Sequence, residues 1–283
     1  MVPVKALRPS LSHSLRPSLS HALSHALRAT VEMVWPTACG GCGSPGPAWC
    51  GSCRDETVRV SYPGGSRLVR PIPCPEGCPP TWAATPYDGA ARAALVAFKD
   101  GDRRDLRTVL SPMLSGAMAG ALVLDPRLAA VVSLGPGPVS VVPVPSSPSA
   151  VRRRGDAPLE LLARDAAAQC ARSGAVLVVS PALRLRRRVA DQAGLNHRQR
   201  AANLEHAMAV RPGWQARVQG ATCLLVDDVL TTGATLAEAA RALRAGGAAH
   251  VAAATVAATQ RRGVPAGGPQ RSGELLQYLS RGA

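Results

Sequence analysis

Aromatic residues and lysine are both scarce in this sequence. Aromatic side chains make up 3% of the 283 residues, and Phe98 is the single phenylalanine. A protein that stacks the bases of single-stranded nucleic acid needs exposed rings along a groove, so the scarcity counts against that class. Lys5 and Lys99 are the only lysines among 33 basic residues. The net charge of +15 therefore comes from arginine, and it gives moderate support to an anionic partner.

Long hydrophobic runs are also missing. No stretch of 18 or more residues is uninterruptedly apolar, and the most apolar segment, residues 113–134, is broken by Asp125 and Arg127. We therefore predict no membrane span. The N-terminus lacks the charged, apolar and small-residue pattern of a secretory signal, so we expect a cytoplasmic protein.

The chain divides into four parts by composition. Residues 1–32 hold an imperfect repeat, LRPSLSHS and LRPSLSHA, which predicts a low-complexity, disordered tail, although its histidines leave metal binding open. Residues 33–80 are rich in Cys, Gly and Pro and predict a small zinc-binding module. Residues 81–262 alternate between helix and strand patterns, and residues 263–283 predict a flexible tail. With 46% apolar residues the chain can bury a large core.

Six of the eight cysteines lie between positions 39 and 78. They form three pairs: Cys39 and Cys42, Cys50 and Cys53, and Cys74 and Cys78. Two C-x-x-C pairs in Gly-rich turns favour a closed tetrahedral Zn²⁺ site, which is structural and not catalytic. Disulfides or free thiols are the alternative, and a cytoplasmic protein disfavours disulfides. The third pair could bind a second ion, exchange with the first four ligands, or do neither.

The remaining pattern predicts an α/β fold with a parallel sheet. Short, continuous, β-branched apolar runs at 139–145, 221–229 and 251–259 indicate buried parallel strands. An amphipathic helix is expected between the last two strands and ends at Gly246-Gly247, and another is expected at 89–101. Strand, loop, helix and strand in this order form a right-handed parallel unit.

The stretch LLVDDVLTTGAT, residues 224–235, joins an apolar strand to a loop and a helix. In parallel α/β sheets ligands bind beyond the carboxyl ends of the strands, next to the following helix N-termini. The loop has neither a G-x4-G-K-[ST] nor a G-x-G-x-x-G pattern, and no lysine is near it in the sequence. Its backbone N–H groups predict a phosphate site, and Gly233 allows a close approach. The loop residues are Val229, Leu230, Thr231, Thr232, Gly233, Ala234 and Thr235.

Two acids directly precede this phosphate loop. Carboxylates accept hydrogen bonds from vicinal hydroxyls, so Asp227 and Asp228 fit the ribose of the molecule whose phosphate the loop holds. The predicted ligand is therefore a ribose 5-phosphate. The alternative is an ordinary strand–helix turn in which the threonines cap the helix.

This stretch resembles the phosphoribosyl pyrophosphate (PRPP) signature of type I phosphoribosyltransferases. Further segments are similar to one branch, the ComF family: the N-terminal cysteine pairs and residues 87–106, 141–156 and 186–203. The likeness extends over roughly residues 35 to 260. It implies a type I phosphoribosyltransferase fold, with a parallel sheet, preceded by a small Cys-rich zinc module.

The resemblance also implies a reaction and the residues for it. A nitrogen nucleophile would displace pyrophosphate at the anomeric carbon of PRPP, with Mg²⁺ on the diphosphate and Asp227 and Asp228 on the ribose hydroxyls. The residues that match the pyrophosphate loop of the family are Pro145, Ser146, Ser147, Arg154 and Gly155. The next residue, Asp156, departs from the aromatic or amide expected in many relatives.

A basic segment follows in the sequence. Residues 184–200 carry six arginines and one aspartate, which predicts either a mobile flap over the diphosphate or a solvated basic surface. His197 within it is an acid/base candidate, although a lone loop histidine is more often neither. No segment has a pattern that indicates a nucleobase pocket.

Three functions agree with these patterns. The first is a phosphoribosyltransferase acting on an unidentified nitrogen acceptor. The second, implied by the ComF resemblance, is an accessory protein in the uptake of single-stranded DNA, with the DNA and a DNA-translocating helicase as partners. The third is a non-catalytic sensor of PRPP. The sequence does not fix the oligomeric state.

Overall fold

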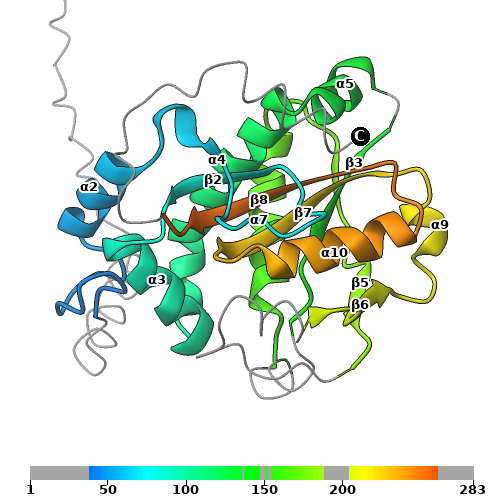
Figure 1. Cartoon of the computed structure of the whole chain (residues 1–283). Helices are drawn as coiled ribbons and strands as arrows, with labels where there is room; N and C mark the ends of the chain where they lie inside the picture. Colours follow the sequence, from blue (N-terminus) through cyan, green and yellow to red (C-terminus); the bar gives the residue numbers. More distant parts are fainter. Residues whose placement is uncertain (1–37, 136, 147–150, 152–154, 188–203, 261–283) are drawn as a thin grey trace, which may run out of the picture.

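The structure is a computed structural model that describes residues 38–135, 137–146, 151, 155–187 and 204–260. The predicted tails at 1–32 and 263–283 lie outside these residues. Within them the chain forms three layers, a central sheet with helices on both faces (Figure 1).

The central sheet has six strands in the order β1-β2-β8-β7-β3-β4. All neighbours from β2 to β4 are parallel, and β1 is an antiparallel edge strand. A separate two-stranded antiparallel ribbon consists of β5 and β6. The strands are β1 Arg67–Val69, β2 Thr81–Pro86, β3 Val139–Pro143, β4 Leu177–Val179, β5 Leu183–Leu185, β6 Met208–Val210, β7 Thr222–Leu230 and β8 His250–Ala258.

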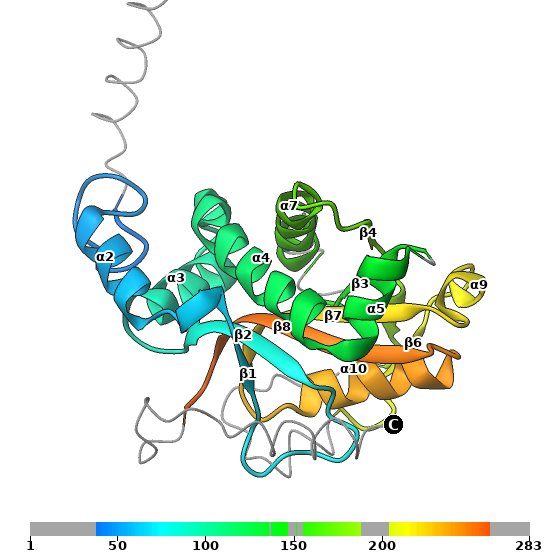
Figure 2. The same cartoon turned by 90° about the horizontal axis from the view of Figure 1, so that it is seen from above.

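Helices cover both faces of this sheet. Figure 2 shows α4, α5 and α7 on one side and α10 on the other. The helices are α2 Gly51–Val60, α3 Gly89–Asp100, α4 Arg107–Leu124, α5 Pro126–Leu134, α7 Pro158–Ala171, α9 Gln215–Val218 and α10 Ala234–Ala245, with short 3₁₀ turns η1 Pro63–Gly65 and η2 Arg104–Leu106.

Two hydrophobic clusters, one on each face of the sheet, make up the core. Successive residues of a strand point to opposite faces, so β7 contributes Leu224 to the cluster under α4 and α7, and Leu225 to the cluster under α10. Both leucines are fully buried. Burial on both faces explains why the strands are continuous apolar runs without a polar alternation.

The sequence-based predictions of the elements are confirmed with small shifts. The expected strands at 139–145, 221–229 and 251–259 are β3, β7 and β8, and the expected helix at 89–101 is α3, which Gly101 ends. β3 ends two residues earlier than expected, at Pro143, and β7 includes Val229 and Leu230, which were expected in the phosphate loop.

In the part of the chain that the structure describes, the segment Arg104–Leu124 is long and apolar enough to cross a membrane by length and composition. It contains α4, whose Leu110, Leu114 and Met118 are fully buried in the core cluster between α4 and the sheet. This is the position of a core helix in a three-layer α/β fold.

Candidate functional site

The carboxyl ends of β2, β8, β7 and β3 lie side by side at one edge of the sheet. The register places Pro143 of β3 opposite Val226 of β7, and the N–H of Val144 donates to the Val226 carbonyl over 3.0 Å. On the other side of β7, Leu230 lies opposite Ala258. The segments that follow these strands therefore meet at this edge, where ligands bind in parallel α/β proteins.

Asp227 and Asp228 lie near the end of β7, and each accepts a hydrogen bond from the following residue. The N–H of Asp228 donates to Asp227 Oδ1 over 2.9 Å, and the N–H of Val229 donates to Asp228 Oδ1 over 2.8 Å. Burial, and after it the negative charge of Asp228, raises the pKa of Asp227 to about 8. The Asp227 carboxyl therefore holds its proton to a higher pH than an isolated aspartate does.

A lysine from a distant part of the sequence completes this group. Lys99, at the end of α3, places Nζ 2.9 Å from Asp228 Oδ2. Burial lowers the pKa of Lys99, but the attraction of Asp228 and Asp227 outweighs it, so the pKa lies above its usual value. Its positive charge in turn counteracts the rise in the pKa of Asp227. More than a hundred residues separate Lys99 from the acids, so no spacing rule could have found it.

The phosphate loop is shorter than predicted. Val229 and Leu230 belong to β7 and pair with Ala257 and Ala258, so the prediction that they are loop residues was wrong. The paired edge of β8 extends the strand by two residues, and Leu230 is buried in the core. The loop itself is Thr231–Gly233, and α10 begins at Ala234.

The amides of this loop remain available for a ligand. No described residue accepts a hydrogen bond from the N–H of Thr231, Thr232 or Gly233, while the Ala234 N–H has a long contact of 3.4 Å with Thr232 Oγ1. Thr259 stabilises the loop through a backbone carbonyl, because its Oγ1 donates to the Thr231 carbonyl over 3.3 Å. Unused amides at the N-terminus of a 12-residue helix form an anion-binding arrangement.

Gly233 is required by backbone conformation and by space. Its φ of 77° lies in the left-handed region that favours glycine. A Cβ atom here would lie 2.8 Å from Cγ of Pro71 and 3.1 Å from Sγ of Cys78. The connection between β1 and β2 thus packs directly against the loop, a contact that the sequence did not predict.

The predicted pyrophosphate loop begins beside Asp227, directly after β3. Pro145 and Ser146 are half-buried at this edge, whereas Ser147 and Arg154 lie outside the described residues. Gly155 has a φ of 77°. Asp156 forms a two-pronged ion pair with Arg104, with Nε to Oδ2 at 2.8 Å and Nη2 to Oδ1 at 3.0 Å. Asp156, which stands where an aromatic or amide was expected, therefore ties this loop to η2, just after α3.

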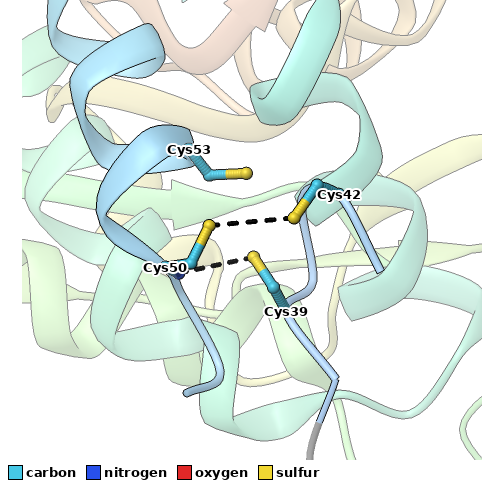
Figure 3. Close-up of side chains that lie close together, drawn as sticks. All are labelled: Cys39, Cys42, Cys50 and Cys53. Atoms are coloured by element: carbon cyan, nitrogen blue, oxygen red, sulfur yellow. Dashed lines mark hydrogen bonds between the residues drawn. The ribbon is translucent and has the colours of Figure 1, made fainter. Parts of the chain in front are cut away.

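Four cysteines form the predicted metal centre (Figure 3). The sulfur atoms of Cys39, Cys42, Cys50 and Cys53 lie within 4.8 Å of one another. Cys42 Sγ and Cys50 Sγ are 3.7 Å apart, and a tetrahedron with Zn–S bonds of about 2.3 Å has an edge of about 3.8 Å. Backbone N–H groups of Gly41 and Cys50 donate to Cys39 Sγ, each over 3.4 Å. The donor set is compatible with structural zinc.

All eight cysteines are free thiols. In the part of the chain that the structure describes, the four-cysteine cluster is the one group of three or more potential metal ligands. Cys74 and Cys78 do not join it, since they lie in the connection beside Gly233.

The cysteine cluster is attached to the helix that carries Lys99. Cys39 and Cys53 pack against Ala90 in the first turn of α3. Glu56 of α2 accepts a hydrogen bond from the Ala90 N–H over 2.9 Å, which places a carboxylate at the positive end of α3. The cysteine module therefore holds the N-terminus of α3. The C-terminal end of the same helix reaches Asp228.

The ribbon of β5 and β6 carries the start of the predicted basic flap. Glu238 of α10 is buried and accepts a hydrogen bond from the Met208 N–H over 2.8 Å, and Arg241 donates to the Met208 carbonyl over 3.0 Å. The pair of Glu238 and Arg241 therefore fixes β6 on α10. Residues 188–200 of the flap, including His197, lie outside the described residues.

Comparison with known proteins agrees with the geometry of this edge. A model of the phosphoribosyl transferase domain matches residues 170–272, which include β7, the acids and the phosphate loop. No curated protein matches the chain. The predicted fold class is confirmed, with a mostly parallel α/β sheet after an N-terminal cysteine cluster. The match, the fold and the cluster together fit a protein with a phosphoribosyltransferase domain and a zinc-type cysteine module, which at the level of the family indicates a PRPP-using transferase.

Proposed function

We propose that this protein binds PRPP together with Mg²⁺ at the carboxyl edge of the sheet and transfers the phosphoribosyl group to a nitrogen acceptor. One observation carries the proposal: the acidic pair Asp227–Asp228 lies near the end of β7, and the loop that follows the strand has N–H groups at the N-terminus of α10 that no described residue accepts. A ribose 5-phosphate needs both kinds of group, acceptors for its hydroxyls and donors for its phosphate.

Binding begins with the phosphate loop. The 5-phosphate accepts hydrogen bonds from the N–H groups of Thr231 to Ala234 and from the threonine hydroxyls, at the positive end of α10. Asp227 and Asp228 then accept hydrogen bonds from the ribose hydroxyls. An ionised carboxylate accepts better than a protonated one, so the charge of Lys99, which favours the ionised pair, supports binding.

Catalysis in this arrangement is mainly a matter of positioning. The transition state for displacement at the anomeric carbon resembles an oxocarbenium ion, so holding the ribose at both ends and aiming donors at the departing diphosphate lowers the barrier. The loop after β3, which starts at Pro145, would bind the diphosphate, and the support is that it begins beside the acids at the same edge of the sheet. Mg²⁺, when bound, neutralises diphosphate charge through ligand oxygens and water.

We also propose that Cys39, Cys42, Cys50 and Cys53 hold one structural Zn²⁺. The support is the spacing of the sulfur atoms and the two N–H donors to Cys39 Sγ. Four thiolates close the coordination sphere, so the ion has a folding role.

The resemblance to the ComF family offers an accessory role in single-stranded DNA uptake as a second candidate. The net charge of +15 supports a polyanionic partner, and the scarcity of aromatic rings argues against base stacking. If pyrophosphate is not released with any acceptor while single-stranded DNA binds with a steep salt dependence, this role replaces the transferase.

The ribose assignment is tested by the double variant Asp227→Asn, Asp228→Asn. Calorimetric titration with Mg²⁺ and PRPP should show binding for the wild-type protein and none for the variant, because amides lack the charge of the acceptors. Asp165→Asn serves as the matched control, since this acid pairs with Arg107 on the helical face. Unchanged affinity in the double variant would refute the ribose assignment, and pyrophosphate release across a panel of bases identifies the acceptor.

A further inference from the structure

The pair Cys74–Cys78 has no part in the metal centre or in the proposed reaction. Both cysteines lie in the connection between β1 and β2 and are half-buried. A turn brings them together, with the Cys78 N–H donating to the Pro75 carbonyl over 3.2 Å and Gly77 at a φ of 71°. The turn brings the two thiols close enough that each shifts the pKa of the other.

This turn is seated on the phosphate loop. Sγ of Cys78 would lie 3.1 Å from a Cβ atom on Gly233, which means that the sulfur is packed against the backbone of the loop. A second contact holds the turn to the same helix, because Nη1 of Arg244 in the last turn of α10 donates to the Gly77 carbonyl over 2.7 Å. Figure 2 shows the connection, in cyan, beside α10, in orange. A change in the turn therefore reaches Gly233 directly.

The surroundings favour a reactive thiolate at one of the two positions. The hydrogen bond from Cys78 lowers the pKa of Cys74 to about 6, with burial opposing and Arg70 assisting. The same hydrogen bond raises the pKa of Cys78, so the pair shares its proton unequally. A partly exposed thiolate beside positive charge, with a second thiol in contact, is the arrangement of reactive dithiols.

We propose that Cys74 and Cys78 form a thiol–disulfide site that controls occupancy of the phosphate loop. The Cys74 thiolate attacks one sulfur of a low-molecular-weight disulfide, forms a mixed disulfide and releases one thiolate. Cys78 then loses its proton to solvent and attacks Cys74 Sγ, which releases the second thiolate. In sum, two protein thiols and one small disulfide give one protein disulfide and two small thiols, and the electrons balance.

Oxidation changes the support of Gly233. A disulfide has an S–S bond of about 2.0 Å and a torsion near 90°, so bonding to Cys74 changes the position of Cys78 Sγ at its contact with the loop. Gly233 then loses one of the contacts that hold its left-handed conformation, and the amides of the loop become less well aligned for a phosphate. This consequence rests on the proposed PRPP binding at the same loop. By linkage, bound PRPP must oppose disulfide formation by the same factor.

The test uses the full chain with its metal, equilibrated in glutathione buffers of increasing oxidised fraction. Peptide mass spectrometry measures the Cys74–Cys78 disulfide, and calorimetry measures the affinity for Mg²⁺ with PRPP. We expect oxidation to weaken binding by at least about fivefold, the lower end of usual coupling between sites. PRPP should also shift the disulfide titration toward more oxidising buffers.

Cys74→Ser is the matched control, because it abolishes the disulfide and leaves the four-cysteine cluster intact. Its affinity should not respond to the glutathione ratio, and Cys78→Ser gives a second variant if the first folds poorly. Response in both variants would assign the effect to the cluster and overturn the proposal. A disulfide that forms without any change in affinity would also overturn it. Failure of the reduced wild-type protein to bind PRPP refutes the proposed function instead, while the disulfide titration still reports on the thiol pair.

Discussion

At the scale of single residues, the ion pair between Lys99 and Asp228 sets the charge of the acidic site. Two neighbouring carboxylates at a half-buried strand end repel each other, and burial adds to the cost of ionising both. Lys99, 2.9 Å from Asp228, is the cation that counteracts this cost. One of the two lysines in the sequence therefore lies beside the acidic pair at the carboxyl edge of the sheet.

Replacing Lys99 with methionine removes the charge and keeps most of the side-chain length. Since Lys99 lowers the pKa of Asp227, which is raised to about 8, its loss moves that pKa further up. The acid then stays protonated over a wider range, so we expect the affinity for Mg²⁺ with PRPP to fall about tenfold near neutral pH, or about 1.4 kcal/mol. Affinity should recover as the pH rises above this pKa, which calorimetry at several pH values measures.

Lys99→Arg is the control, because it retains the positive charge beside Asp228. Its affinity should stay close to that of the wild-type protein, whose own affinity rises with pH as the acid ionises. A Lys99→Met defect that grows with pH would contradict the electrostatic explanation.

At the scale of elements, the phosphate loop depends on a glycine held in the left-handed region. Gly233→Ala adds a strain of about 1–2 kcal/mol for the positive φ. It also places Cβ 2.8 Å from Cγ of Pro71, so the loop must move. We expect PRPP binding to fall by more than about tenfold, that is, by over 1.4 kcal/mol. Calorimetry checks the affinity and thermal unfolding checks the stability.

Gly220→Ala separates strain from function. Gly220 has a φ of 71° and nothing within 4 Å of an added Cβ, and it precedes β7 at the opposite end of that strand. This variant should lose similar stability through its positive φ and keep its PRPP affinity. Equal binding losses in both variants would mean that general destabilisation, not loop geometry, explains the effect.

The sequence predicted elements well and contacts poorly, for a physical reason. Buried strands and amphipathic helices are encoded by local periodicity, so β3, β7, β8, α3 and α10 were predicted to within a few residues. The acids and the phosphate loop are contiguous, so their motif was also visible. Lys99 and the turn at Cys78 reach the same site from distant segments, and only the packing of α3 and of the β1–β2 connection brings them there. The extension of β7 past Asp228 likewise depends on pairing with β8.

At the scale of the whole molecule, the cysteine module and the acidic site are connected through α3. The cluster packs on the first turn of this helix and Glu56 binds its N-terminus, while Lys99 in its last turn contacts Asp228. Arg104, just beyond α3, links the helix to the predicted pyrophosphate loop. Its guanidinium donates hydrogen bonds to both the Phe98 carbonyl and Asp156. The module thus supports the helix that organises two sides of the site.

Metal removal tests this connection. Because four thiolates without an ion repel one another when ionised and lose their cross-link, chelation should unfold the module and lower the midpoint of thermal unfolding by several degrees, as for a loss of roughly 1–3 kcal/mol. We expect the affinity for PRPP to fall as well, because α3 loses its anchor at Glu56 and Lys99 is no longer held at Asp228. Metal analysis should find close to one zinc per chain, and added zinc should restore both properties.

A double comparison shows whether the effect on affinity passes through Lys99. If it does, chelation should cost the Lys99→Met protein less affinity than the wild-type protein, because the contact that α3 delivers is already missing. Equal losses in the two proteins would show that the module acts on the site by another route, such as the Arg104–Asp156 pair. The shift in the midpoint of thermal unfolding should be the same in both proteins, since Lys99 does not contact Ala90, where the cluster packs. An equal thermal shift with unequal losses of affinity would separate the folding role of the metal from its effect on PRPP binding.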